Sequence, residues 1–192
     1  MTAHLSPRDL LPDPANSALL IIDVQERLAA AMPGDVSSRV IRNTAILLHC
    51  AREFSLPVMI SEQYPRGLGP TTAEIKALLP EKTVPAEKTV FSCCAAPSFQ
   101  PLLEKLGERS VIVCGIETHV CVLQTTLDLL QAGRRVYVAA DAAGSRTKQN
   151  WRIGLDLMRR AGAIIGSTET FAFALLGSAG TETFKRISRL VK

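Results

Sequence analysis

The sequence predicts a three-layer α/β/α sandwich around a mainly parallel sheet of six strands. Three observations carry this prediction. Short apolar runs of strand length alternate along the chain with segments whose apolar residues recur at helical spacing. The runs are nearly continuous, as is typical of strands buried on both faces. The segments between them hold helices, which parallel strands need as crossover connections.

The first third of the chain begins with an irregular arm, residues 1–16, in which prolines block regular structure. The first expected strand is 18–22, which is apolar throughout. A short helix or loop follows at 23–34 and is closed by a Pro-Gly pair. Apolar residues then recur near the helical period over 35–54, and a Leu-Pro step separates this helix from a second strand at 58–60.

The middle of the chain starts with a loop over 61–70 that is rich in glycine and proline. A threonine can cap a short helix over 71–79. Residues 88–91, with the sequence K-T-V-F, are expected to form the third strand. A helix is expected over 97–106.

The last third begins with the stretch S-V-I-V-C-G-I-E-T-H-V-C-V-L-Q-T-T-L-D-L-L-Q-A-G, residues 110–133. It predicts a strand at 111–114, a tight turn, and a helix from Cys121 to about residue 132, with a glycine at the C-terminal cap. The remaining expected elements are a strand at 135–140, a helix at 148–161, a strand at 163–165, and two short helical segments at 170–176 and 181–191. We expect one domain, 1–192.

Composition excludes several classes of protein. A formal net charge of +4, with basic residues spread along the chain, indicates a solvated surface and not a nucleic-acid groove. Five cysteines, an odd number without framework spacing, indicate free thiols in a reducing compartment. The N-terminus lacks the apolar core of a signal peptide, and no apolar run is long enough to span a membrane. We therefore expect a cytoplasmic protein.

Cys121 is the first candidate catalytic residue. At the first turn of a helix, the positive end of the helix dipole favours a thiolate and hence a nucleophile. The alternative is that Cys121 is a small buried apolar residue, as most cysteines are.

Asp23 and Lys88 are the other candidates. A carboxylate beside a thiol can accept its proton and later return it to a leaving group, and a lysine near both stabilises their negative charges. Ligands in parallel α/β sheets bind beyond the carboxyl ends of the strands, where Asp23 is expected, whereas Lys88 falls at the start of its predicted strand. Alternatively, Asp23 caps a helix and Lys88 is an exposed strand end. Spacing alone does not bring the three together.

Three blocks of sequence resemble the isochorismatase-like cysteine hydrolases, a superfamily that includes nicotinamidases, N-carbamoylsarcosine amidohydrolases and isochorismatases. The blocks are A-L-L-I-I-D-V-Q at 18–25, E-K-T-V-F-S at 87–92 and G-I-E-T-H-V-C-V at 115–122. They occur in the family's order, and the resemblance extends over nearly the whole chain. The implied fold is the Rossmann-like fold of these hydrolases.

This resemblance implies a role for each candidate. Asp23 would be the acid/base, Lys88 its electrostatic partner and Cys121 the nucleophile. A non-proline cis peptide bond would join Ile116 to Glu117, and the backbone N–H groups of Glu117 and Cys121 would form an oxyanion hole. Lys88 at a strand start would then be a feature of the family.

Two departures from the family narrow the reaction. Nicotinamidases bind a metal through an Asp-x-His pair after the second strand and a further histidine. The corresponding region here, I-S-E-Q-Y-P-R-G-L-G-P, has no histidine, and His4, His49 and His119 show no metal-binding spacing. We expect no catalytic metal and no cofactor, which disfavours nicotinamidase activity. Isochorismatases that cleave a vinyl ether lack the cysteine, so Cys121 argues against that reaction.

Substrate contacts and assembly follow from the subgroup that this chain resembles most, the isochorismatase-domain-containing proteins. Gln25, Tyr64, Phe91 and Thr118 would lie near the thiol and bind substrate, although Tyr64 and Phe91 could equally be packing residues. His119 is assigned a surface or interface role, because residues two apart on a helix point in different directions. The family commonly forms homo-oligomers, and the apolar tail 171–176 is a candidate interface or core segment.

The leading hypothesis is a metal-independent cysteine hydrolase that cleaves a C–N bond of a small amide or carbamoyl-type substrate through a thioester. The alternative is an oligomeric binding or scaffold protein that keeps the fold without turnover. A nuclease or RNA-binding role is weakly motivated by the pI of 8.9.

Overall fold

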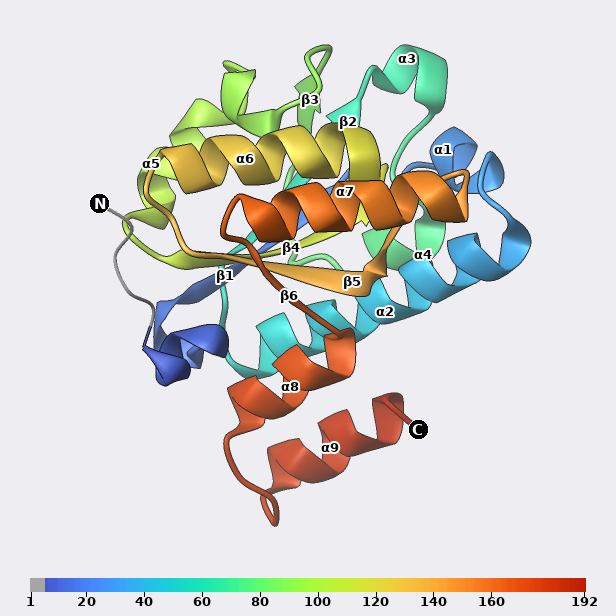
Figure 1. Ribbon diagram of the computed structural model, residues 1–192. Coiled ribbons are helices and arrows are strands. Elements are labelled where there is room, and N and C mark those ends of the chain that lie inside the picture. The colour runs from blue at the N-terminus through green and yellow to red at the C-terminus, as the bar shows by residue number, and fades with distance from the viewer. Residues whose placement is uncertain (1–5) are drawn as a thin grey trace.

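One six-stranded parallel sheet runs through the computed structural model, which describes residues 6–192 (Figure 1). The strand order is β3-β2-β1-β4-β5-β6, and every neighbouring pair is parallel. This confirms the predicted fold class. The strands are β1 (Ser17–Ile22), β2 (Val58–Gln63), β3 (Ala86–Lys88), β4 (Ser110–Ile116), β5 (Val136–Gly144) and β6 (Ile164–Gly166).

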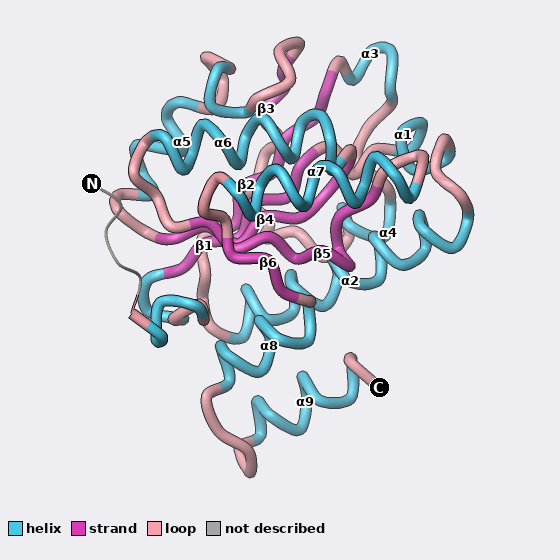
Figure 2. The backbone as a smooth tube through the Cα atoms, in the orientation of Figure 1, coloured by secondary structure: helices cyan, strands magenta, loops and turns pink. Residues whose placement is uncertain are grey.

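Helices cover both faces of this sheet, as the cyan and magenta tubes of Figure 2 show. One layer contains α5 (Gln100–Leu106), α6 (Leu123–Gln131) and α7 (Lys148–Arg160). The other contains α2 (Gly34–Glu53), α4 (Ala73–Lys76), α8 (Thr168–Leu176) and α9 (Glu182–Leu190). The shorter elements are α1 (Glu26–Ala30), α3 (Pro65–Leu68), the 3₁₀ turns η1 (Pro7–Leu10), η2 (Pro14–Asn16) and η3 (Cys93–Ala95), and the π-helical turn η4 (Thr118–Val122).

The side chains of β1 alternate between two separate cores. Leu19 and Ile21 pack with α2 and α8, whereas Leu20 and Ile22 pack with residues of α6 and α7 on the opposite face. Because both faces are covered, every residue of β1 is buried. This explains why the strand is a continuous apolar run in the sequence.

The expected strands at 58–60 and 135–140 continue to Gln63, within the expected loop, and to Gly144. Three further expected elements differ from the structure. The third strand ends at Lys88 and does not begin there, because β2 offers its last paired residue, Gln63, opposite Lys88. Val90 and Phe91, which suggested a strand, are instead exposed in the following turn. The N-terminal arm forms two short 3₁₀ turns. Each begins with a proline, whose fixed φ suits the first position of a helical turn.

The third difference concerns Cys121. It lies in the π-helical turn η4, before α6 begins at Leu123. In η4 the Val122 N–H donates to the Glu117 carbonyl five residues earlier, at 3.2 Å. A π-type turn of this kind is common at functional sites.

The strand order reverses between β1 and β4. From β1 the sheet grows through β2 to β3 on one side, and from β4 through β5 to β6 on the other. The loops leaving β1 and β4 therefore diverge at their carboxyl ends, which is where ligands bind in this class of sheet.

Gly115 allows β1 and β4 to approach each other at this point. Its φ is +127°, and a Cβ atom there would lie 2.0 Å from the carbonyl oxygen of Ile22. Only glycine tolerates both conditions. The close approach brings the chain after β1 beside the chain after β4.

The apolar tail is divided between core and surface. Phe171 and Leu175 of α8 are buried against the sheet and α2, whereas Phe173 is exposed. No helix within residues 6–192 combines the length and the apolar character needed to cross a bilayer.

Candidate active site

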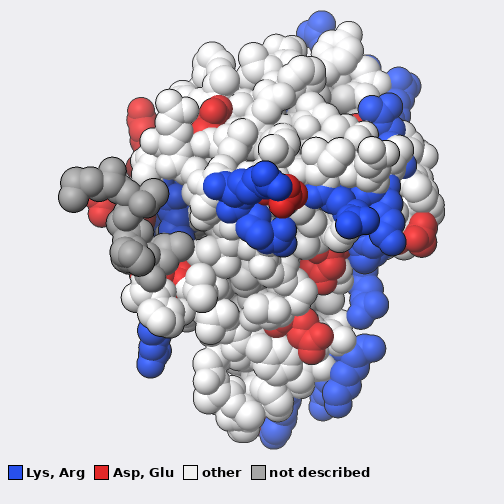
Figure 3. Space-filling model, viewed as in Figure 1, with Lys and Arg blue, Asp and Glu red and all other residues white. Residues whose placement is uncertain are grey.

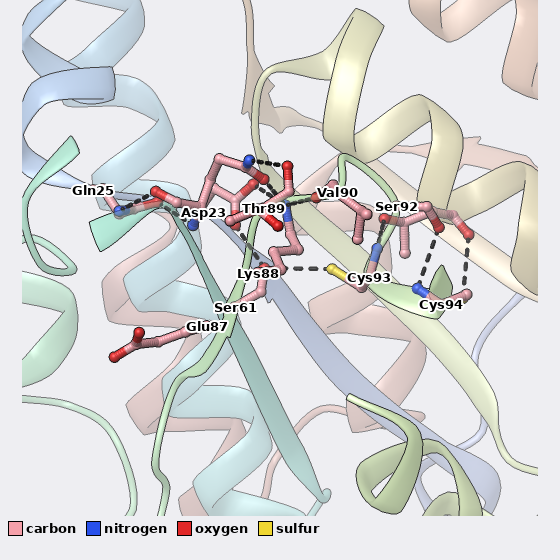
Figure 4. A network of polar contacts seen from close by, with 12 residues as sticks. Asp23, Gln25, Ser61, Glu87, Lys88, Thr89, Val90, Ser92, Cys93 and Cys94 are labelled. Carbon is pink, nitrogen blue, oxygen red and sulfur yellow. Dashed lines mark hydrogen bonds and ion pairs between the residues drawn. The ribbon is translucent and has the colours of Figure 1, made fainter. Parts of the chain in front are cut away.

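Asp23 directly follows β1 and is fully buried. Its φ of +51° is in the left-handed region, which aspartate tolerates better than most residues. Its N–H donates to the Ser61 carbonyl at 3.2 Å. One carboxylate oxygen, Oδ2, accepts from Lys88 Nζ at 2.7 Å, and the other, Oδ1, accepts from Ser61 Oγ at 2.7 Å (Figure 4).

Lys88 enters the same site from the last residue of β3. Its ammonium donates to Asp23, to Gln63 Oε1 at 2.7 Å and to the Val90 carbonyl at 3.4 Å. Burial lowers the pKa of Lys88, but the negative charge on Asp23 and the neighbouring thiols outweighs it, and the pKa is raised overall. A buried ion pair of this kind stays charged because each member compensates the other.

Cys121 completes the cluster from η4, with 6% of its surface exposed. Asp23 and Lys88 are both close enough to change the pKa of its thiol. The structure thus brings Asp23, Lys88 and Cys121 together, although they are separated by 65 and 33 positions in the sequence.

The environment of Cys121 opposes the expected thiolate. Burial raises the pKa of the thiol to about 12, and the Asp23 carboxylate adds to this, against the opposing effect of Lys88. Desolvation and a like charge therefore outweigh the helix end. The resting cysteine is a protonated thiol next to a carboxylate, so attack on a substrate needs a base to take the proton.

Glu117 follows β4 and precedes the turn η4 that carries Cys121. The Ile116–Glu117 peptide bond is cis. The Glu117 carboxylate accepts from the backbone N–H of Arg146 at 3.1 Å and from its Nε at 3.2 Å. The side chain is thus tied to the β5–α7 connection. The oxyanion-hole role of the Glu117 and Cys121 N–H groups stays a prediction.

A surface hollow of about 490 Å³ lies at Lys88. Tyr64 and Phe91, both about half exposed, are near it: Tyr64 lines it and Phe91 follows its lining residue Val90. Arg66 also lines it, whereas Arg146 is paired with Glu117.

Gln25 is fully buried and its amide is committed to the backbone. Its Nε2 donates to the carbonyls of Gln63 and Gly69, at 3.0 and 2.6 Å, and its Oε1 accepts from the Gln63 N–H at 2.7 Å. Both amide hydrogens are therefore used. In the structure Gln25 thus holds the β2–α3 loop in place, and its contact with a substrate stays a prediction.

Thr118 and His119 are neighbours in η4, but their side chains have different surroundings. Thr118 is fully buried and its hydroxyl has no hydrogen-bond partner within the described residues, so its contact with a substrate stays a prediction. His119 contacts Ser145 Oγ at 3.0 Å through Nδ1 and Asn150 at 3.2 Å through Nε2. These contacts join η4 to the start of α7.

Sequence reasoning missed Ser61 and Gln63. Both lie on β2, two residues apart, so their side chains point to the same face. They contact Asp23 and Lys88, whereas Glu62 between them accepts from Thr71 on the other side. The available signal was the polar run 61–63, which directly follows the apolar residues 58–60.

No cluster of three or more potential metal ligands among His, Cys, Asp and Glu occurs within residues 6–192. The site that the described residues do form is a buried carboxylate–ammonium pair with a thiol beside it, at the reversal point of a doubly wound sheet. The fold and the site together define a doubly wound α/β protein with a buried polar cluster at its ligand-binding edge.

Comparison with known proteins identifies the family. The isochorismatase domain matches residues 17–170, and the chain belongs to this family. Human isochorismatase domain-containing protein 2 is 38% identical over 183 residues, which cover 93% of this chain and 84% of the relative. The secreted isochorismatase effector Isc1 of Phytophthora sojae is 39% identical over 186 residues, covering 93% and 86%.

Solved structures agree with this assignment. The MAR1 ribonuclease of Caenorhabditis elegans superimposes with a TM-score of 0.86 at 38% identity, covering 94% of this chain and 92% of that one. The YcaC gene product of Escherichia coli, described as an octameric hydrolase of unknown specificity, has a TM-score of 0.84 at 23% identity, covering 93% and 89%. The latter similarity concerns the fold.

Proposed function

We propose that this protein is a metal-independent cysteine hydrolase that cleaves the C–N bond of a small amide or carbamoyl-type substrate. The observation that carries the proposal is the buried Asp23–Lys88 ion pair, 2.7 Å long, beside a protonated Cys121 thiol. A base, a cation and a nucleophile within one water-poor site are the groups that acyl transfer needs.

The first half of the reaction forms a thioester. Asp23 accepts the Cys121 proton as the sulfur attacks the substrate carbonyl carbon, and an S–C bond forms. Backbone N–H groups of Glu117 and Cys121 would receive the oxyanion. Asp23 then returns the proton to the leaving nitrogen, the C–N bond breaks, and an amine or ammonia departs.

The second half releases the acid. Asp23 accepts a proton from a water molecule that attacks the thioester carbonyl, and the S–C bond breaks as that proton passes to the sulfur. Lys88 keeps the Asp23 carboxylate charged between these transfers and balances the negative charge of the sulfur. The thiol is regenerated, and no group outside the chain is consumed except water.

The test uses 4-nitrophenyl acetate as a general acyl donor, followed by a panel of small amides. Acylation of Cys121 releases 4-nitrophenolate in a burst and leaves an acetylated cysteine that peptide mass spectrometry locates. Cys121→Ala should abolish the burst, a loss of at least about a hundredfold. Cys114→Ala is the matched control, because Cys114 is a buried thiol in the other core.

An unchanged burst in Cys121→Ala, or acetyl groups located on other cysteines alone, would contradict the proposal. The same result would favour the alternative of an oligomeric scaffold that keeps the fold without turnover. Homo-oligomerisation itself stays a prediction from the family resemblance, as does the cytoplasmic location.

A ribonuclease-type activity is a second candidate. It is motivated by the similarity to a protein described as the MAR1 ribonuclease and by basic side chains that gather along α7 in Figure 3. Lys148, Arg152 and Arg159 are among them, whereas Arg160 is paired with Asp156 at 2.8 Å. RNA binding that weakens steeply with salt, and RNA cleavage that persists in Cys121→Ala, would favour this candidate.

A further inference from the structure

Ser61 connects the Asp23 carboxylate to a second cysteine. The serine lies on β2 and is fully buried. Its hydroxyl donates to Asp23 Oδ1 at 2.7 Å and accepts from the thiol of Cys93 at 3.4 Å. The result is a directed chain, from thiol to hydroxyl to carboxylate, which Figure 4 shows beside the Lys88 contacts.

The direction of this chain depends on Cys93 keeping its proton. Burial raises the pKa of Cys93 to about 11, and the Asp23 charge adds to the effect while Lys88 opposes it. The backbone N–H of Cys93 donates to Thr125 Oγ1 at 2.9 Å, which anchors η3 against α6. At neutral pH the thiol therefore donates to Ser61, and the serine hydrogen is directed to Asp23.

Asp23 has charged or titratable neighbours on three elements packed against it. Lys88 approaches from β3, Cys121 from η4 and Cys93 from η3. Lys88 holds Oδ2 and is itself held by Gln63 Oε1. Ser61 is thus the hydroxyl that holds Oδ1, whereas Lys88 holds Oδ2.

We propose that Ser61, oriented by the Cys93 thiol, is a positioning residue that holds the Asp23 carboxylate ionised and aligned as the proton acceptor for Cys121. The inference rests on the proposed function and deepens it, since it names the residue that prepares the base. Ser61 touches neither the substrate nor the reacting sulfur in this role.

The principal experiment is the pH dependence of Cys121 acylation by 4-nitrophenyl acetate in Ser61→Ala. A carboxylate that loses a hydrogen-bond donor binds a proton more readily. The acidic limb of the rate should therefore move to higher pH. The rate at neutral pH should fall by roughly tenfold, because the carboxylate is also less well aligned with the thiol. Cys93→Ala should move the limb in the same direction by less, because Ser61 keeps its bond to Asp23.

The matched control is Ser17→Ala. Ser17 is a buried serine at the opposite end of β1, where its hydroxyl pairs with Ser110 Oγ at 3.0 Å. This variant should leave the acidic limb in place. Ser61→Ala and Ser17→Ala profiles that superimpose would overturn the inference, as would a Ser61→Ala rate that falls equally at every pH.

A second measurement separates this inference from the proposed function. If wild-type Cys121 is not acylated at all, the hydrolase proposal fails, and the free energy of urea unfolding then decides the role of Ser61. A hydrogen-bond donor stabilises the charged form of a carboxylate more than the neutral acid. The destabilisation by Ser61→Ala should thus shrink as the solution is made more acidic than pH 7, whereas that by Ser17→Ala should stay constant. Equal pH dependence in the two variants would overturn the inference.

Discussion

The Asp23 side chain has two opposing effects on Cys121. It disfavours the thiolate, and it is the proposed acceptor of the thiol proton. Asp23 adopts a positive φ, forms a fully buried ion pair with Lys88, and raises the pKa of the cysteine whose proton we propose it accepts. A carboxylate in contact with a thiol disfavours the thiolate, because both charges are negative. The same contact places the Asp23 carboxylate next to the thiol proton that it is proposed to accept. Reactivity of Cys121 therefore depends on proton transfer during the attack on the substrate, and not on a thiolate formed beforehand.

Asp23→Asn separates these two effects. Removing the carboxylate removes a charge that raises the pKa of Cys121, so the thiol should titrate at lower pH, which thiolate absorbance measures against a Cys121→Ser blank. Acylation by 4-nitrophenyl acetate should nevertheless fall by about a hundredfold or more, since the general base is lost. Thiolate content and acylation rate that fall together would contradict this account.

At the scale of elements, α7 supports the turn that carries the cysteine. Gly154 faces η4 so closely that a Cβ atom there would lie 2.9 Å from the Thr118 carbonyl oxygen and 3.0 Å from the His119 Cα. His119 also contacts Asn150 of α7. The position of Cys121 thus depends on a helix that contributes no side chain to the ion pair.

Gly154→Ala tests this dependence. Alanine normally stabilises a helix interior by up to about 1 kcal/mol relative to glycine. Here the added methyl group meets backbone atoms, and we expect destabilisation of about 1–3 kcal/mol in urea unfolding. The acylation rate of Cys121 should fall as well. Gly34→Ala, at a helical glycine with no atom within 4 Å of the new Cβ, is the control. A Gly154→Ala protein with wild-type stability and wild-type acylation would show that the contact does not support η4.

At the scale of the whole molecule, the five thiols couple the fold to alkaline pH. All are free, and each has a raised pKa, to about 11 for Cys93 and about 12 for the others, with burial as the largest cause. A raised folded-state pKa contributes stability that is complete below the unfolded value, about 8.5 for cysteine, and is lost as pH rises toward the folded value.

We therefore expect the free energy of unfolding to decline from about pH 8.5 upward. Each thiol that ionises only in the unfolded chain steepens the decline by up to about 1.4 kcal/mol per pH unit. Cys114→Ala should lower stability at pH 7 through the cavity it leaves but reduce the alkaline slope, because one such thiol is gone. Urea unfolding between pH 7 and 10 measures both values, and an unchanged slope in Cys114→Ala would contradict this explanation.

The order of elements and the class of fold followed from the chain itself. Continuous apolar runs such as residues 18–22 indicated strands covered on both faces, and the helical segments between them required parallel pairing. Prediction failed where pairing partners decide the outcome. Residues 89–91 have strand-forming side chains, but β2 ends opposite Lys88, and the chain turns there.

The candidate site divides in the same way. Local sequence and family resemblance singled out Asp23, Lys88 and Cys121, because each lies in a short block of sequence that resembles the family. Ser61, Gln63 and Cys93 escaped notice, since hydrogen bonds to residues 25 to 38 positions away define their roles. The pKa of Cys121 also depends on the tertiary structure, because burial and the Asp23 charge arise only when β1, β3 and η4 meet. The sequence by itself determined which elements form and which reactive groups exist. The tertiary structure decided which of those groups are in contact. The physical reason is that charges brought together in a low-dielectric interior interact strongly and so set the protonation of the thiol.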